Sequence, residues 1–90
     1  MKTIYKYELT LDRECHIQMP CHSQILSIQN QNNKIMLWAL VDTENENEAR
    51  VFEIYGTGHP MDDYYEQDRI HHATIQIGIF VWHIFERFEN

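Results

Sequence analysis

Short alternations of apolar and polar side chains open the chain and predict antiparallel β-strands. Residues 3–11 place apolar side chains at every second position, which is typical of a strand with one buried and one exposed face. Residues 15–19 repeat the alternation, with Cys15, Ile17 and Met19 expected to point inward. The charged turn between the two segments predicts that they pair as a hairpin. The apolar face of the first strand consists of Tyr5, Tyr7, Leu9 and Leu11.

A second hairpin is predicted from residues 24–29 and 34–41. Four residues, 30–33, join its strands, and three of them are asparagine, which tolerates the left-handed backbone that tight turns require. Residues 35–41 are apolar on both faces, which is typical of a central strand. We therefore expect this strand to be covered on both sides, by another layer of the fold or by a second subunit.

The second half of the chain alternates between strands and polar connections. Residues 50–55 are expected to form a strand, after a loop without apolar periodicity. Two glycines and a proline in residues 56–60 predict a sharp corner. Residues 61–69 are polar and acidic and allow at most one short helical turn. Residues 70–88 are rich in β-formers and predict two strands divided at Gly78, or one long bent strand.

Together these elements predict an all-β, mainly antiparallel fold of about six to seven strands in a single domain that spans residues 1–90. The expected architecture is a small two-layer sheet or a partly open barrel. A chain of 90 residues encloses only a small core, and strands that are apolar on both faces are hard to bury within it. We therefore expect the chain to complete its core as a homodimer.

The charge of the chain narrows the choice of partners. The formal net charge is −7, and residues 42–68 hold nine acidic side chains against one base, Arg50. Such a surface repels a phosphate backbone, so direct binding to nucleic acid is not expected. An acidic face favours a basic partner protein, or it simply keeps a small protein soluble.

Targeting signals are not expected either. No apolar run approaches the roughly 20 residues of a membrane span, and residues 1–8 lack the apolar core of a signal peptide. Cys15 and Cys21 have no compact zinc spacing and are expected to be two free thiols in a reducing compartment. The expected location is therefore the cytoplasm, with no membrane partner.

The corner at residues 56–60 is the most distinctive local motif. Its backbone amides, Thr57 and His59 are suited to hold an anion, or the segment is only a structural turn. It lacks both the third glycine of a Rossmann fingerprint and the Gly-Lys-Ser/Thr of a P-loop. Tyr64 and Tyr65 are candidates for interface anchors or for a clamp on a flat ring, unless one of them packs inward. The candidate partner- or ligand-binding residues are Tyr55, Gly56, Thr57, Gly58, His59, Asp62, Asp63, Tyr64, Tyr65 and Glu66.

The six histidines do not form a metal-ligand pattern. His71 and His72 are adjacent, so in a strand they point to opposite faces, and no His-x-His or His-x-x-x-His pair is present. We therefore expect no metal and no cofactor. Cysteine–histidine neighbours and paired carboxylates supply residue types for catalysis, but neighbours in sequence do not define a pocket. We expect no catalytic residues and a protein that is not an enzyme.

Six blocks of the chain, taken in order, carry a family resemblance. They are residues 4–9, 19–20, 25–29, 37–42, 54–59 and 80–83. Together they resemble a family of small proteins that are encoded by tailed bacteriophages and prophages and have no settled activity, and the resemblance covers nearly the whole chain. The chain departs from the family's pattern in three loops. Residues 21–23 replace Lys-Gly-Ala, residues 32–33 replace Asn-Gly, and residues 71–72 replace Gly-Thr.

The resemblance implies a phage protein in a bacterial cytoplasm, and small acidic phage proteins without enzymatic motifs often act by binding. The leading hypothesis is a non-enzymatic binding protein that interferes with a host protein, such as a counter-defence inhibitor of an immune factor. Its expected working surface combines the acidic segment with the corner. One alternative is a sponge for a nucleotide-like signalling ligand, which the net acidity disfavours unless positive groups such as Arg50, Arg69 and Lys34 gather locally. Another alternative is a structural or accessory phage protein.

Overall fold

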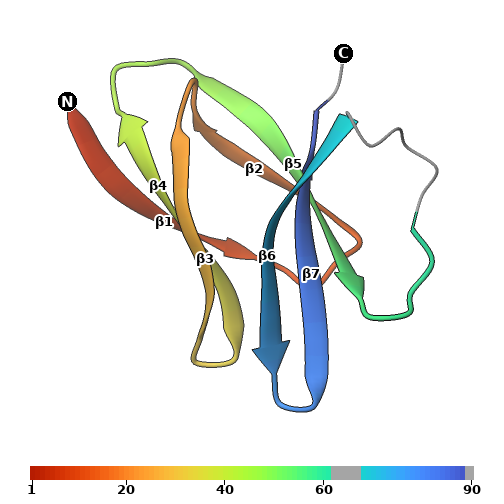
Figure 1. The fold of residues 1–90 in the computed structure, drawn as a ribbon. Coiled ribbons are helices and arrows are strands. Elements are labelled where there is room, and N and C mark those ends of the chain that lie inside the picture. The colour runs from red at the N-terminus through yellow and green to blue at the C-terminus, as the bar shows by residue number, and fades with distance from the viewer. Residues whose placement is uncertain (62–67, 89–90) are drawn as a thin grey trace.

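The computed structural model describes residues 1–61 and 68–88, and these residues fold into seven antiparallel β-strands (Figure 1). The predicted all-β class is therefore confirmed. The predicted helical turn within residues 61–69 falls mostly outside the described residues. The strands are β1 (Lys2–Leu9), β2 (Glu14–Pro20), β3 (Gln24–Gln31), β4 (Lys34–Asp42), β5 (Asn47–Gly56), β6 (Arg69–Ile77) and β7 (Phe80–Arg87).

The strands form two sheets with the orders β1-β4-β3 and β2-β5-β7-β6, which we call sheet A and sheet B. The predicted hairpin of β3 and β4 is confirmed, with Ile28 opposite Leu37. Its turn places Asn32 and Asn33 at φ angles of 54° and 65°. Asparagine adopts these left-handed angles at low cost, which explains why the chain reverses at this point.

The predicted hairpin of the first two strands is wrong. β1 pairs with β4 in sheet A, with Tyr7 opposite Leu37, whereas β2 pairs with β5 in sheet B, with Cys15 opposite Phe52. The turn at residues 10–13 therefore carries the chain from one sheet to the other. Both strands still direct an apolar face toward the same core, so their alternation was informative about burial but not about their partners.

The core lies between the inner faces of the two sheets. Side chains alternate along each strand, so one row of each strand is buried and the next row faces outward. β3 lies beside β6 at one side of the molecule, where the Asn30 side-chain amide donates to the Gln76 carbonyl at 3.1 Å (Figure 1). The buried cluster comprises Leu9, Ile28, Ile35, Leu37, Ala39 and Val41 of sheet A and Cys15, Met19, Phe52, Ile54, Ile75 and Ile84 of sheet B.

The C-terminal β-rich segment forms the predicted pair of strands, divided at Gly78, which has a φ of 60°. The register of β6 against β7 shifts between His71 and Ala73, so His72 occupies a bulge. The His71 ring contacts Phe85, whereas His72 reaches Glu86. Since residues 85 and 86 lie on opposite faces of β7, the two histidines diverge as expected.

Candidate functional site

The corner that follows β5 is a tight turn closed by His59. The His59 backbone amide donates to the Gly56 carbonyl at 3.0 Å, and the Gly56 amide donates to His59 Nδ1 at 3.2 Å. A Cβ atom at position 56 would lie 2.7 Å from His59 Cε1, and Gly58 has a φ of 86°. Both glycines are therefore required by this geometry, one by close approach and the other by a left-handed backbone.

His83 of β7 ties the corner to the edge of sheet B. Thr57 Oγ1 lies 2.7 Å from His83 Nε2, and Thr74 Oγ1 of β6 lies 3.1 Å from His83 Nδ1. The Thr57 amide also donates to the Val81 carbonyl at 3.3 Å. Two strands, β6 and β7, thus hold the corner through one imidazole. The sequence pattern did not identify His83 because its partners are distant in sequence.

The Thr57–His83 pair has the spacing of a nucleophile and a general base. Whether His83 can act as that base depends on the group that hydrogen-bonds to its other ring nitrogen. That partner is the Thr74 hydroxyl, which also lies 3.0 Å from His71 Nε2. A neutral hydroxyl does not stabilise an imidazolium in the way that the carboxylate of a catalytic triad does. This arrangement is suited to fixing the position of the corner rather than to activating Thr57.

Large apolar side chains project beside the corner, at the turn between β6 and β7. Ile79 is 89% exposed and Phe80 is 60% exposed. The His59 and Trp82 rings approach edge to face, with centroids 6.2 Å apart. A shallow pocket of roughly 280 Å³ lies here, and we call its lining the tip surface. The tip surface consists of Gly56, Thr57, His59, Ile79, Phe80, Val81 and Trp82.

Among the described residues of the predicted site, the structure sets Tyr55 apart from the corner. Thr57, Gly58 and His59 lie exposed in the corner, whereas Tyr55 is only 2% exposed. The Tyr55 ring packs edge to face on Phe85 and beneath the Arg69 guanidinium, so it belongs to the fold and not to a contact surface. Asp62, Asp63, Tyr64, Tyr65 and Glu66 lie outside the described residues.

The acids at residues 42–48 do not form a single surface with the corner. Acids at residues 42–48 precede or begin β5, whereas the corner follows its other end (Figure 1). The ten residues of β5 separate the two by roughly 30 Å. Glu53, between them, is buried and accepts from Arg69 Nε at 2.8 Å and from Arg87 Nη1 at 3.2 Å. Among the described residues, the acids at 42–48 and the corner are therefore two separate regions, whereas Asp62, Asp63 and Glu66 of the expected working surface lie outside the described residues.

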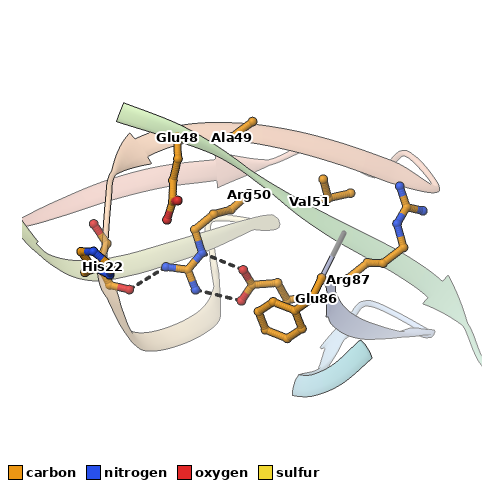
Figure 2. A pocket seen from close by; sticks show the side chains of 9 residues that line it. His22, Glu48, Ala49, Arg50, Val51, Glu86 and Arg87 are labelled. Carbon is orange, nitrogen blue, oxygen red and sulfur yellow. Dashed lines mark hydrogen bonds and ion pairs between the residues drawn. The ribbon is translucent and has the colours of Figure 1, made fainter. Parts of the chain in front are cut away.

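A larger pocket of roughly 530 Å³ opens between the start of β3 and the inner face of sheet B (Figure 2). Arg50 donates from Nε and Nη2 to the two carboxylate oxygens of Glu86, at 2.6 and 2.9 Å, and from Nη1 to the Ser23 carbonyl at 2.6 Å. His72 Nε2 lies 2.8 Å from Glu86 Oε1. Figure 2 shows the Arg87 side chain pointing away from this group.

This pocket is organised by charges that compensate one another. Burial alone would raise the pKa of Glu86, but hydrogen bonds from His72 and Arg50 outweigh burial and hold that pKa below its ordinary value. The same pairing raises the pKa of Arg50. Each nitrogen of the guanidinium already donates within the fold, so the pocket offers an anionic ligand little free positive charge. The hydrogen bonds among Arg50, Glu86, His72 and the Ser23 carbonyl hold β5, β6, β7 and the start of β3 together.

Arg50, Arg69 and Lys34, the positive residues named for a nucleotide-like ligand, do not gather. Arg50 pairs with Glu86 on the inner face of sheet B, and Arg69 pairs with Glu53 on the outer face. Lys34 lies in the other sheet, at the start of β4. The condition that the sponge hypothesis placed on these three residues is therefore not met.

The remaining chemistry concerns the two cysteines, the metal-ligating side chains and the possible membrane spans within the part of the chain that the structure describes. Cys15 is buried and Cys21 is half-buried, and both are free thiols. Burial, followed by the charge of Glu48, raises the pKa of Cys21. Residues 1–61 and 68–88 contain no cluster of three or more metal-ligating side chains. None of their elements is a helix with the length and apolar character to cross a membrane.

The fold and the tip surface define a small two-sheet antiparallel β-domain with an exposed apolar edge. A family profile described as "Domain of unknown function (DUF7352)" matches residues 1–90. The chain therefore belongs to this family. Neither the curated proteins nor the solved structures contain a match.

Proposed function

We propose that this chain is a non-enzymatic binding protein that recognises a partner protein through the tip surface. The observation that carries the proposal is the exposure of Ile79 and Phe80 beside the pocket of the corner. A turn between two strands has no folding requirement for large apolar side chains directed at water. Neighbouring apolar anchors surrounded by polar groups are typical of the energetic centre of a protein interface.

The geometry of the corner supports the same proposal. Gly56, Thr57 and His59 are held in place by hydrogen bonds to the sheet, so the partner meets a largely preformed surface. A preformed surface loses little conformational entropy on binding. The partner would present an apolar groove for Phe80, with hydrogen-bonding groups at the rim for the corner.

The resemblance to bacteriophage proteins extends the proposal to the origin of the partner. In that setting the partner is a host protein of the bacterial cytoplasm, such as an immune factor whose action the chain blocks. The acidic residues near the start of β5 lie far from the tip surface, so we assign them to solubility rather than to this contact.

A nucleotide-like ligand is the second candidate, because the shallow pocket lined by His59 and Trp82 offers aromatic side chains against which a flat ring could pack. The dispersal of Arg50, Arg69 and Lys34 weighs against it. A thermal-shift panel of nucleotides and cyclic dinucleotides distinguishes the two candidates. A ligand held at 100 times its Kd stabilises the fold by about 2.7 kcal/mol, whereas a protein-binding module shows no shift.

Site-specific photocrosslinking tests the protein-binding proposal. A photoreactive amino acid at position 79 is compared with one at Gln18, an exposed position on the edge strand β2. In bacterial lysate we expect a discrete adduct from position 79 that position 18 does not give. The adduct should disappear when Phe80→Ser is added. Identical adducts from both positions, or an adduct insensitive to Phe80→Ser, would contradict the proposal.

A further inference from the structure

The outward row of β4 presents an apolar strip on the outer face of sheet A. Met36, Trp38 and Leu40 are half-buried, although the inward row that alternates with them is fully buried. Ile4, opposite Leu40 on β1, is 55% exposed. A central strand with apolar side chains on both faces normally has a layer on each side. We propose that a second copy of this chain covers this face, giving a symmetric dimer.

The order of side chains along this row is self-complementary. The row reads Lys34, Met36, Trp38, Leu40, Asp42, with a cation at one end, an anion at the other and the indole midway. A two-fold axis in the interface plane, perpendicular to β4 at Trp38, places Lys34 of each copy against Asp42 of the other. The same operation places Met36 against Leu40. Isologous dimers require this kind of self-matching surface.

The distribution of charge favours the same face. Each copy carries a net charge of −7, so two copies repel over most of their surface. All three lysines of the chain, Lys2, Lys6 and Lys34, lie on the outward rows of β1 and β4. The acids on those rows are Glu8 and Asp42. The outer face of sheet A therefore lacks the excess of acids that makes two copies of this chain repel one another.

The size of the face is small for a dimer interface. Three strands about 4.8 Å apart, with the nine residues of β4 rising about 3.4 Å each, cover roughly 400 Å² per copy. Two such faces bury roughly 800 Å² in total, which is at the low end for specific association. A face of this size fits a weak, transient dimer that dissociates on dilution.

Charge reversal tests the proposed symmetry directly. Lys34→Asp sets two carboxylates against each other across the dimer, and Asp42→Lys sets two ammonium groups against each other. Sedimentation velocity over a concentration series should show each variant with a Kd raised at least tenfold. An equimolar mixture of the two variants should restore association, because every end-to-end pair is then opposite in charge. Failure of the mixture to associate would overturn the two-fold arrangement.

Two further variants distinguish this interface from contacts made elsewhere on the molecule. Trp38→Ser removes the centre of the strip and should leave a monomer whose circular dichroism spectrum is unchanged. Ile79→Asp alters the tip surface and should leave the dimer intact. A failure of the dimer proposal can therefore be distinguished from a failure of the proposed function. A wild-type chain that stays monomeric at several hundred micromolar, or a dimer lost only with Ile79→Asp, would refute the proposal.

Discussion

Replacing Glu86 with glutamine tests whether the buried ion pairs stabilise the fold. Glu86 is 2% exposed and receives hydrogen bonds from two Arg50 nitrogens and from His72. The amide is close to the carboxylate in shape but carries no charge, and its NH₂ group cannot accept from a donor. Glu86→Gln therefore leaves the Arg50 charge in place without its counter-charge.

The expected cost is large relative to the stability of a small domain. Removing one partner of a buried ion pair typically costs about 3–5 kcal/mol. A domain of 90 residues is stable by roughly 5–13 kcal/mol, so this single substitution should remove at least about a quarter of the total. For this size each kcal/mol corresponds to about 4–8 °C, and the melting temperature should fall by at least about 12 °C.

Equilibrium unfolding in urea, followed by circular dichroism, measures the loss. Glu48→Gln is the matched control, because Glu48 lines the same pocket but is exposed. It should change stability by no more than about 0.5 kcal/mol. A loss below about 1 kcal/mol in Glu86→Gln would refute the reasoning, since it would mean that the pair is not shielded from water.

A double replacement identifies the cause of that loss. Arg50→Met together with Glu86→Leu removes both charges and keeps apolar volume between the strands. Because the cost of the single variant comes from an unpaired buried charge, the double variant should recover most of the stability. If it is as unstable as the single variant, the hydrogen bonds from Arg50 to Ser23 and from His72 are the essential contacts instead.

Three further predictions concern pH and the corner. Hydrogen bonds lower the pKa of Glu86 in the fold. The Glu86 carboxylate therefore stabilises the fold above about pH 4.5, and this stabilisation is lost as pH falls through the folded pKa. Glu86→Gln should flatten this acid branch of a stability–pH curve. Gly56→Ala must displace the His59 ring, and melting should show a loss of about 1–3 kcal/mol. Thr57→Val removes the hydroxyl bound to His83, and hydrogen exchange should quicken at the corner, with an overall cost of about 1 kcal/mol, while β4 stays protected.

The strands of this fold could be predicted from the sequence because buried and exposed positions alternate within each short segment. The alternation in residues 15–19 and the asparagines at 32 and 33 specify an inward face and a turn without reference to the rest of the chain. The pairing of β1 could not be predicted in the same way. Its apolar face fits beside β2 or beside β4, and only the assembled core decides between them.

The candidate site was predicted in part, for a similar reason. Glycines at 56 and 58 identify a corner, since they are needed for local backbone geometry. The contact between Thr57 and His83 spans 26 residues of sequence and leaves no local pattern. Glu53 was counted with the solvated acids, although its neighbours on β6 and β7 bury it and neutralise it. A prediction based on composition does not separate paired charges from free ones.

Recognition through the tip surface is tested most sharply by comparing binding and folding in one variant. Phe80 is exposed and lies outside the buried cluster, so Phe80→Ser should keep the melting temperature within about 3 °C of the wild type. The partner captured at position 79 should bind this variant at least tenfold more weakly in calorimetric titration. Equal affinity for both proteins, or weaker binding only where the variant has unfolded, would contradict the claim that recognition depends on the exposed tip.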